Sequence, residues 1–199
     1  MTRRIGVLGG TFDPIHIGHL VFAEAALEQL GLERVIFVPA GQPWRKSDRL
    51  VTSAPLRLEM VRLAIADNPP FAVSTLEIDR EGPTYSEITL SAVRDENPGA
   101  DLFFLLGRDA LADLPNWHDP SAVVGLATLA VALREAVAAS AEEDLALARL
   151  NARVVSVSMP VIGVSSTDIR ERVANGKSIR YMVPDLVADY IETQGLYAS

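Results

Sequence analysis

Two histidines, His16 and His19, lie three positions apart around Gly18, in a chain that has three histidines in all. They follow a glycine turn, Gly9 and Gly10, that ends a short apolar run. Such glycines let the backbone approach a phosphate, and the next helix presents free N–H groups and the positive end of its dipole. Side chains three positions apart share one helix face, so both imidazoles can donate to a phosphate chain. The stretch therefore indicates a phosphate-binding site, with simply packed or exposed histidines as the alternative.

A second candidate anion site is the stretch "GVSSTDIR" near the C-terminus. Ser165, Ser166 and Thr167 begin a predicted helix after a predicted strand, and they offer hydroxyls and backbone N–H groups. Arg170 falls one turn into that helix, where its guanidinium is a fork-shaped donor for an anion. The alternative is ordinary N-capping, which serine and threonine provide at many helix starts.

Three single residues are weaker candidates. Lys46 lies in a long loop that could close over phosphates, although a loop lysine is more often only solvated. Trp117 could stack on a ligand ring or pack into the core. Asp109 follows a predicted strand and could bind ribose hydroxyls or cap a helix. The sequence contains no cluster with metal-ligand spacing and no cysteine, so thiolate metal sites and disulfides are excluded.

Strands and helices alternate along the chain, which predicts the elements that would position these residues. This alternation is typical of an α/β fold, a Rossmann-like doubly wound parallel sheet, and we expect one domain over residues 1–199 with helices at its C-terminal end. Ligands of such sheets bind beyond the carboxyl ends of the strands, which is where Gly9 and Gly10 fall. The predicted strands are 4–9, 34–41, 71–79, 101–107, 126–133 and 153–159, and the predicted helices are 19–31, 55–67, 84–96, 141–150, 165–176 and 184–195.

The overall composition narrows the class of partner. The net charge of −8 repels the phosphates of nucleic acid, so a nucleic-acid partner would need a local basic patch. The arginines are scattered and form no such patch in the sequence. Apolar windows stay well below the length of about 18 residues that a membrane-spanning helix needs. The absence of cysteine suits a reducing cytoplasm. A monomer and a homo-oligomer are equally compatible with the sequence.

Several motifs resemble known families. "GGTFDPIHIGH" (Gly9–His19) resembles the signature of the HxGH-type nucleotidyltransferases, and "VSSTDIR" is similar to their second motif, with Val164 in place of an isoleucine. "DREGPTYSEITL", "LLGRDALADLPNWHD" and "YMVPDLVADYIETQGLY" narrow the resemblance to the bacterial nicotinate-nucleotide adenylyltransferases. The resemblance runs over nearly the whole chain and is weakest over residues 132–152.

The resemblance implies the reaction of ATP with nicotinate mononucleotide to give deamido-NAD and pyrophosphate, a step of NAD biosynthesis. Magnesium would arrive with ATP, held by phosphates and water rather than by protein ligands. By similarity, His16, His19, Lys46 and Arg170 are the catalytic residues. The resemblance places ATP against Gly9, Gly10, Thr11, Phe12, Gly18, Gly107, Asp109, Ser165, Ser166 and Thr167, and nicotinate mononucleotide against Thr84, Tyr85, Trp117 and Arg134, with Trp117 stacked on the pyridine ring.

The residue types also fit this reaction apart from the resemblance. The attacking group would be the substrate's phosphate, which is largely dianionic at pH 7 because its second pKa is about 6, so no general base is needed. We also expect the pocket around Thr84, Tyr85 and Trp117 to contain no acid that would repel a carboxylate. Two positions depart from the family pattern: His118 replaces a common aromatic residue, and Arg134 is the one basic residue left of a basic, proline-containing turn.

Three other functions fit the sequence less well. A related transferase acting on phosphopantetheine commonly has threonine at the position of His16 and lacks "GPTYSEITL". A class I aminoacyl-tRNA synthetase fragment would carry a KMSKS-like lysine loop, which this acidic chain lacks. A non-catalytic nucleotide-binding regulator is disfavoured because every expected phosphate ligand is present.

Overall fold

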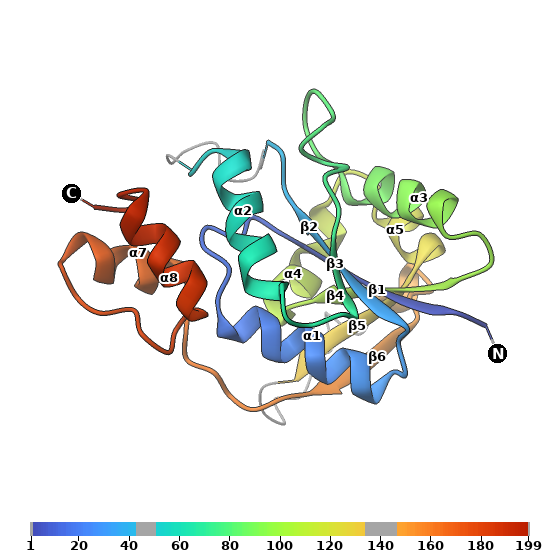
Figure 1. The fold of residues 1–199 in the computed structure, drawn as a ribbon. Helices are drawn as coiled ribbons and strands as arrows, with labels where there is room; N and C mark the ends of the chain where they lie inside the picture. The colour runs from blue at the N-terminus through green and yellow to red at the C-terminus, as the bar shows by residue number, and fades with distance from the viewer. Residues whose placement is uncertain (1, 43–50, 134–146, 199) are drawn as a thin grey trace.

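In the computed structural model, the described residues (2–42, 51–133 and 147–198) form a six-stranded parallel sheet with the order β3-β2-β1-β4-β5-β6 (Figure 1). The order reverses between β1 and β4, and in doubly wound sheets ligands bind at this point. Gly9 pairs with Val38 and Gly10 with Pro39, so β1 and β2 end at the same edge. The strands are β1 (Arg4–Gly10), β2 (Arg34–Pro39), β3 (Phe71–Val73), β4 (Asp101–Leu106), β5 (Thr128–Leu133) and β6 (Val154–Ser158).

Helices cover both faces of the sheet. Along β2, Val35 and Phe37 point into one hydrophobic cluster while Ile36 and Val38 point into the other, so this strand is buried on both sides. None of the described helices is both long and apolar enough to cross a membrane. The first cluster packs under α1 (Ile17–Gln29), α2 (Ala54–Ile65), α7 (Ser166–Ala174) and α8 (Asp185–Thr193); the second packs under α3 (Ser86–Glu96), α4 (Arg108–Asp113), the 3-10 helix η2 (Leu114–Asn116) and α5 (Pro120–Leu126).

The predicted α/β doubly wound sheet is confirmed, with differences in its elements. The strand predicted over 71–79 ends at Val73. It ends there because Ser74 and Thr75 bond locally: the Ser74 Oγ accepts the N–H of Leu76 at 3.3 Å, and the Thr75 carbonyl accepts that of Ile78 at 2.8 Å. Helices α4 and α5 were not predicted. Of the helix predicted over 141–150, residues 147–149 are helical and 141–146 lie outside the described residues.

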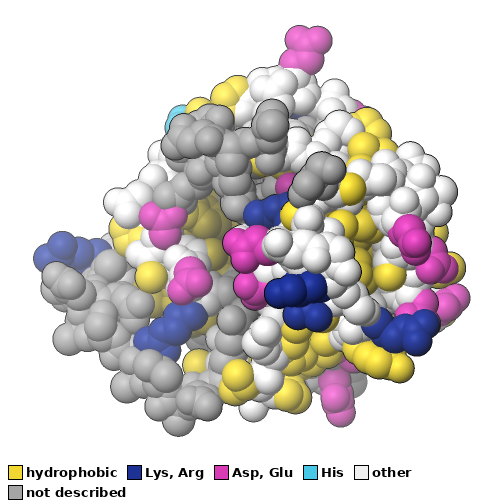
Figure 2. All heavy atoms as spheres, turned by 90° about the vertical axis from the view of Figure 1, so that its left-hand side faces the viewer, with side chains coloured by type: hydrophobic (Ala, Val, Ile, Leu, Met, Phe, Trp, Pro, Cys, Tyr) yellow, Lys and Arg dark blue, Asp and Glu magenta, His cyan; other side chains and the backbone are white. Residues whose placement is uncertain are grey.

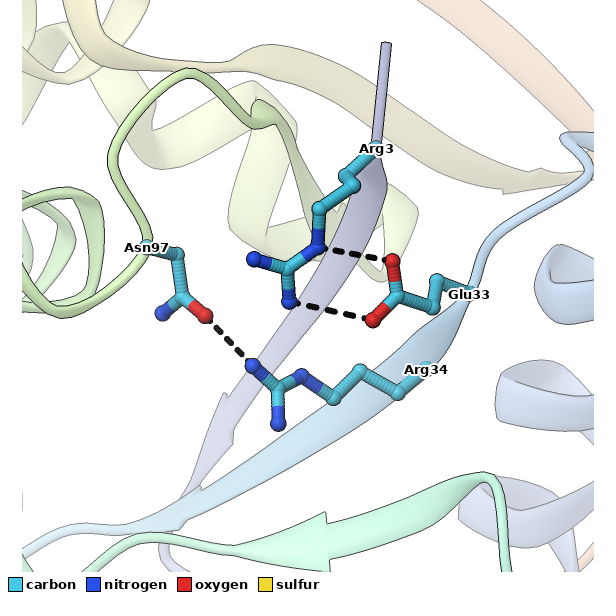
Figure 3. A network of polar contacts seen from close by, with 4 residues as sticks. All are labelled: Arg3, Glu33, Arg34 and Asn97. Carbon is cyan, nitrogen blue, oxygen red and sulfur yellow. Dashed lines mark hydrogen bonds and ion pairs between the residues drawn. The ribbon is translucent and has the colours of Figure 1, made fainter. Parts of the chain in front are cut away.

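A polar network joins the amino ends of β1 and β2 to the end of α3 (Figure 3). Arg3 donates two hydrogen bonds to Glu33, at 2.8 and 3.0 Å. Arg34 donates to the Oδ1 of buried Asn97 at 2.5 Å, while the Nδ2 of Asn97 donates to the carbonyl of Val93 at 2.7 Å. The buried Nε of Arg34 has no hydrogen-bond partner among the described residues, so the bond to Asn97 is important for stabilising this charge.

We expect Asn97→Ala to lower the free energy of unfolding by about 1–3 kcal/mol, because it leaves the Arg34 guanidinium partly buried without its acceptor. Urea denaturation of the purified variant measures this. Glu33→Gln is the matched control and should cost less, because the Arg3–Glu33 pair is exposed to solvent. A wild-type free energy of unfolding for Asn97→Ala would show that the network does not stabilise the fold.

Candidate active site

His16 and His19 form a reciprocal cap at the start of α1. The Nδ1 of His16 accepts the N–H of Gly18 at 3.2 Å, and the Nδ1 of His19 accepts the N–H of His16, also at 3.2 Å. The two rings stack with centroids 3.8 Å apart. This stacking confirms the prediction that the two side chains share one face at the start of the helix.

This cap determines which ring nitrogens can donate. A neutral imidazole carries one proton, and since both Nδ1 atoms accept, the proton of each ring lies on Nε2. Gly18 favours this arrangement, because a Cβ there would lie 3.0 Å from the Cε1 and Nδ1 of His16 and would press on the ring. The backbone of α1 thus fixes both imidazoles in the tautomer that donates through Nε2.

The loop between β1 and α1 is held by side chains from distant segments. Arg170 on α7 donates from Nη1 to the carbonyl of Asp13 at 2.7 Å, and the Ser166 Oγ donates to the carbonyl of Pro14 at 2.9 Å. The start of α7 in "GVSSTDIR" therefore lies against the loop between β1 and α1, the glycine-turn loop, as a shared anion site would require. Ser165 caps α7 by accepting the N–H of Asp168 at 3.1 Å, which is the capping role considered as the alternative.

Arg57, which sequence reasoning missed, holds the other side of the same loop. Arg57 is 1% exposed, and its guanidinium donates to the carbonyls of Thr11 at 2.6 Å, Ala40 at 2.6 Å and Thr52 at 2.8 Å. Burial lowers the pKa of Arg57, and the nearby Asp13 carboxylate counteracts that effect. Within the described residues the acceptors of this buried charge are all backbone carbonyls, an arrangement that organises the loops rather than a substrate.

A cavity of about 630 Å³ opens at the carboxyl edge, over the ends of β1 and β4. Its wall contains predicted residues of both substrate sites, from the glycine turn and from the starts of α3 and α4. It is lined by Gly9, Gly10, Thr11, Ala40, Glu77, Thr84, Tyr85, Ser86, Glu87, Phe104, Leu106, Asp109, Ala110, Asp113, Trp117 and His118.

The expectation that this pocket contains no acid is wrong. Glu77, Glu87, Asp109 and Asp113 line it, from segments that are separated in the sequence and meet only in the fold. Burial raises the pKa of Glu77, which favours its neutral form, although the Thr89 hydroxyl donates to its Oε1 at 2.7 Å and opposes the shift.

His118 has specific partners on the cavity wall. Its Nδ1 lies 2.8 Å from the Oε1 of Glu87, and its ring stacks on Tyr85 with centroids 4.1 Å apart and planes 17° apart. Trp117 lies beside them, edge-on to Phe104 at a centroid distance of 6.0 Å, and no group in the described part of the chain accepts a hydrogen bond from its buried Nε1. Tyr85, Trp117 and His118 thus form an aromatic wall for a planar ring.

The remaining predicted residues have the following places. Phe12 is 2% exposed in the core, so its side chain is packed away from a ligand. Gly107 is the N-cap residue of α4. Thr167 accepts from Arg170 at 3.2 Å through its hydroxyl. Lys46 and Arg134 lie outside the described residues.

The described residues contain no group of three or more His, Cys, Asp or Glu side chains that could hold a metal ion. Any metal used with a nucleotide would therefore find at most one or two protein ligands among them. Phosphate oxygens and water are the ligands that Mg²⁺ keeps in such sites.

The chain is similar to known proteins over most of its length. The model of the cytidylyltransferase-like family matches residues 7–172. The chain is 48% identical to a probable nicotinate-nucleotide adenylyltransferase of Thermomicrobium roseum, over 98% of this chain and 91% of that protein. It is 46% identical to another of the same name from Roseiflexus sp., over 97% of both chains. Its fold is that of nicotinic acid mononucleotide adenylyltransferase of Plasmodium falciparum in complex with NaAD, at a TM-score of 0.80, with 18% identity and coverage of 98% and 97%.

Proposed function

The chain belongs to the cytidylyltransferase-like family and, within it, to the nicotinate-nucleotide adenylyltransferases, and from that premise we propose that it transfers the adenylyl group of ATP to nicotinate mononucleotide. The products are deamido-NAD and pyrophosphate. Relatives that share 43–48% of their residues over nearly the full chain support this assignment. The reaction is a step of NAD biosynthesis.

The proposed step is a single in-line displacement. An oxygen of the mononucleotide phosphate attacks the α-phosphorus of ATP, and the bond from that phosphorus to the bridging oxygen breaks as pyrophosphate leaves. The attacking phosphate is already largely dianionic, so no proton has to be removed first. No covalent enzyme intermediate is needed, and catalysis consists of positioning and charge stabilisation.

The observation that carries the proposal is the double cap of α1. Because the Nδ1 atoms of His16 and His19 accept backbone N–H groups, the proton of each neutral ring lies on Nε2, from which it is proposed to be donated to a phosphate oxygen. Donors fixed before the reaction stabilise developing charge most effectively. Arg170 adds a permanent cation beside the same loop, and Lys46 is proposed to act on the phosphates as well.

Magnesium is proposed to enter as part of the ATP substrate. When bound, the ion would offset part of the negative charge of the phosphates, while the glycine turn and the start of α1 would position the triphosphate. Asp109, beside the cavity at the start of α4, is proposed to contact the adenosine ribose.

The proposal is tested by following pyrophosphate release from ATP with a panel of phosphate acceptors. Release with nicotinate mononucleotide, and not with phosphopantetheine or without acceptor, is the expected result. Release with phosphopantetheine alone would reassign the acceptor within the same superfamily. Nucleotide binding without release in any reaction would favour a regulator.

We expect kcat/KM for nicotinate mononucleotide to exceed that for nicotinamide mononucleotide by about 10². The amino end of α3, which has no side-chain cap bond, lines the cavity at Tyr85 and Ser86 and offers backbone N–H groups to a carboxylate. An amide would turn its NH₂ toward those donors and leave one unpaired, at a cost of about 1–3 kcal/mol for each clash. Both constants are measured at one ATP concentration.

His118→Phe tests how the Glu87 carboxylate on the cavity wall affects this preference for nicotinate mononucleotide. It removes the partner of Glu87 and leaves that carboxylate unpaired on the cavity wall, so the preference for nicotinate should fall. Equal kcat/KM values for the two acceptors in the wild-type enzyme would reject the nicotinate assignment and retain only adenylyl transfer.

A further inference from the structure

The Asp13 carboxylate is a buried junction between separate parts of the chain. Asp13 is 3% exposed, and its Oδ1 accepts the hydroxyl of Tyr197 at 2.8 Å. Its Oδ2 accepts the N–H of Thr52 at 3.4 Å, and its backbone carbonyl accepts from Arg170 at 2.7 Å. The loop that leads into His16 is therefore held by the segment before α2, by α7 and by the tail that follows α8.

Tyr197 is firmly placed for this contact. The tail turns back after α8, where the N–H of Leu196 donates to the carbonyl of Ile191 at 2.9 Å, and Tyr197 adopts a left-handed backbone with φ of 64°. Its hydroxyl also lies 3.9 Å from the sulfur of Met60 on α2. Burial and the Asp13 carboxylate raise the pKa of Tyr197, so the phenol keeps its proton and donates throughout the ordinary pH range.

Three positions separate Asp13 from His16, and Pro14 stiffens the link between them. A shift of Asp13 would therefore move the start of α1, where the Nδ1 atoms of His16 and His19 are set. Misplacement of catalytic groups by about 1 Å can cost roughly 10²-fold in rate. Nothing in the proposed chemistry requires the Tyr197 hydroxyl to touch ATP, so its effect on the reaction would pass through Asp13.

We propose that Tyr197 is a positioning residue for the phosphates of ATP, which acts through the Asp13 carboxylate on the loop that carries His16 and His19. The inference rests on the proposed adenylyl transfer. It assigns to the tail after α8 a part in the reaction, in addition to its packing against the first hydrophobic cluster.

Tyr197→Phe tests this, because it removes only the hydroxyl. We expect kcat to fall by about tenfold to 10²-fold while the KM for nicotinate mononucleotide stays within about twofold. Tyr190→Phe, which removes a phenol hydroxyl from α8, is the matched control and should retain wild-type kcat. Thermal unfolding of Tyr190→Phe should match the wild type, while Tyr197→Phe should unfold at a somewhat lower temperature because buried Asp13 loses one donor, so kcat is compared at a temperature where both variants are folded. A Tyr197→Phe enzyme that only loses stability, with the kcat of the folded fraction unchanged, would overturn the proposal.

Nitrogen NMR of the imidazoles gives a readout that does not depend on turnover. With three histidines in the chain, the ring ¹⁵N shifts of His16 and His19 should change in Tyr197→Phe, while those of His118 serve as the internal reference. Unchanged shifts for all three would overturn the coupling even if activity fell. A wild-type enzyme that transfers no adenylate would refute the proposed function, and the NMR comparison would still decide whether Tyr197 positions the two histidines.

A double-mutant cycle tests whether Tyr197 acts through Asp13. In an Asp13→Ala background, Tyr197→Phe should cost no further activity, because the hydroxyl has lost its acceptor. A full additional loss in that background would show that Tyr197 acts by another route. If Asp13→Ala does not fold, the NMR comparison of Tyr197→Phe with the wild type is decisive.

Discussion

His19→Ala should lower kcat by about 10²–10³, as for the loss of one preorganised donor to a transition state. The Nε2–H of His19 is expected to contact a phosphate oxygen as negative charge builds on the departing pyrophosphate, so its effect should fall on kcat more than on substrate binding. Steady-state kinetics at saturating ATP and mononucleotide measure the change.

The same histidine also caps α1, so a second variant separates the two roles. His19→Asn keeps a side-chain oxygen that can accept the N–H of His16 but has no Nε2–H. We expect its thermal stability to match the wild type while its kcat falls as far as that of His19→Ala. A kcat within about threefold of the wild type in either variant would mean that His19 does not contact the reacting phosphates.

Arg170→Ala should lower kcat/KM for ATP by about 10²–10³, because it removes a fork-shaped cation and the bond that holds the carbonyl of Asp13. Binding of nicotinate mononucleotide alone, measured by calorimetry, should be unchanged, since Arg170 is not among the residues that line the cavity. Arg170→Lys should recover little, because an ammonium cannot reproduce the two directions of the guanidinium.

Arg172→Ala on the same helix is the control for this experiment. Arg172 donates from Nε to the carbonyl of Ser178 at 2.8 Å, away from the glycine-turn loop, and its loss should leave kcat/KM for ATP near the wild-type value. A selective loss of mononucleotide affinity in Arg170→Ala would contradict the assignment of Arg170 to the triphosphate.

The sheet could be predicted from the sequence because most of its strands are short apolar runs, and glycine or proline marks the end of some of them. Gly9 and Gly10 mark the end of β1, and Pro39 is the last residue of β2. Helices α4 and α5 could not be predicted because they have six and seven residues, too few to show helical periodicity. The early end of β3 depends on side-chain bonds of Ser74 and Thr75, whose geometry a pattern of apolar positions does not reveal.

The candidate site was predictable where its residues are close in the sequence, as with His16, Gly18 and His19. Asp13, Arg57 and Tyr197 were missed because each is ordinary in its local context and acquires a role only through contacts across the fold. Of the cavity acids, Glu77, Glu87 and Asp113 were missed for the same reason, whereas Asp109 was predicted as a site residue. A buried arginine such as Arg57 has no local signal, since a helical arginine is normally exposed.

The contacts that complete the site also place it late in folding. All six strands are present once the chain reaches Ser158, so the sheet can form from the residues up to that point. The bonds of Arg170 and Tyr197 to Asp13 span 157 and 184 positions, and contacts of such separation carry the largest cost of loop closure. A newly made chain can therefore hold a finished sheet while the loop before His16, already bonded by Arg57, still lacks the bonds of Arg170 and Tyr197, and the candidate site is complete only when the last helix docks.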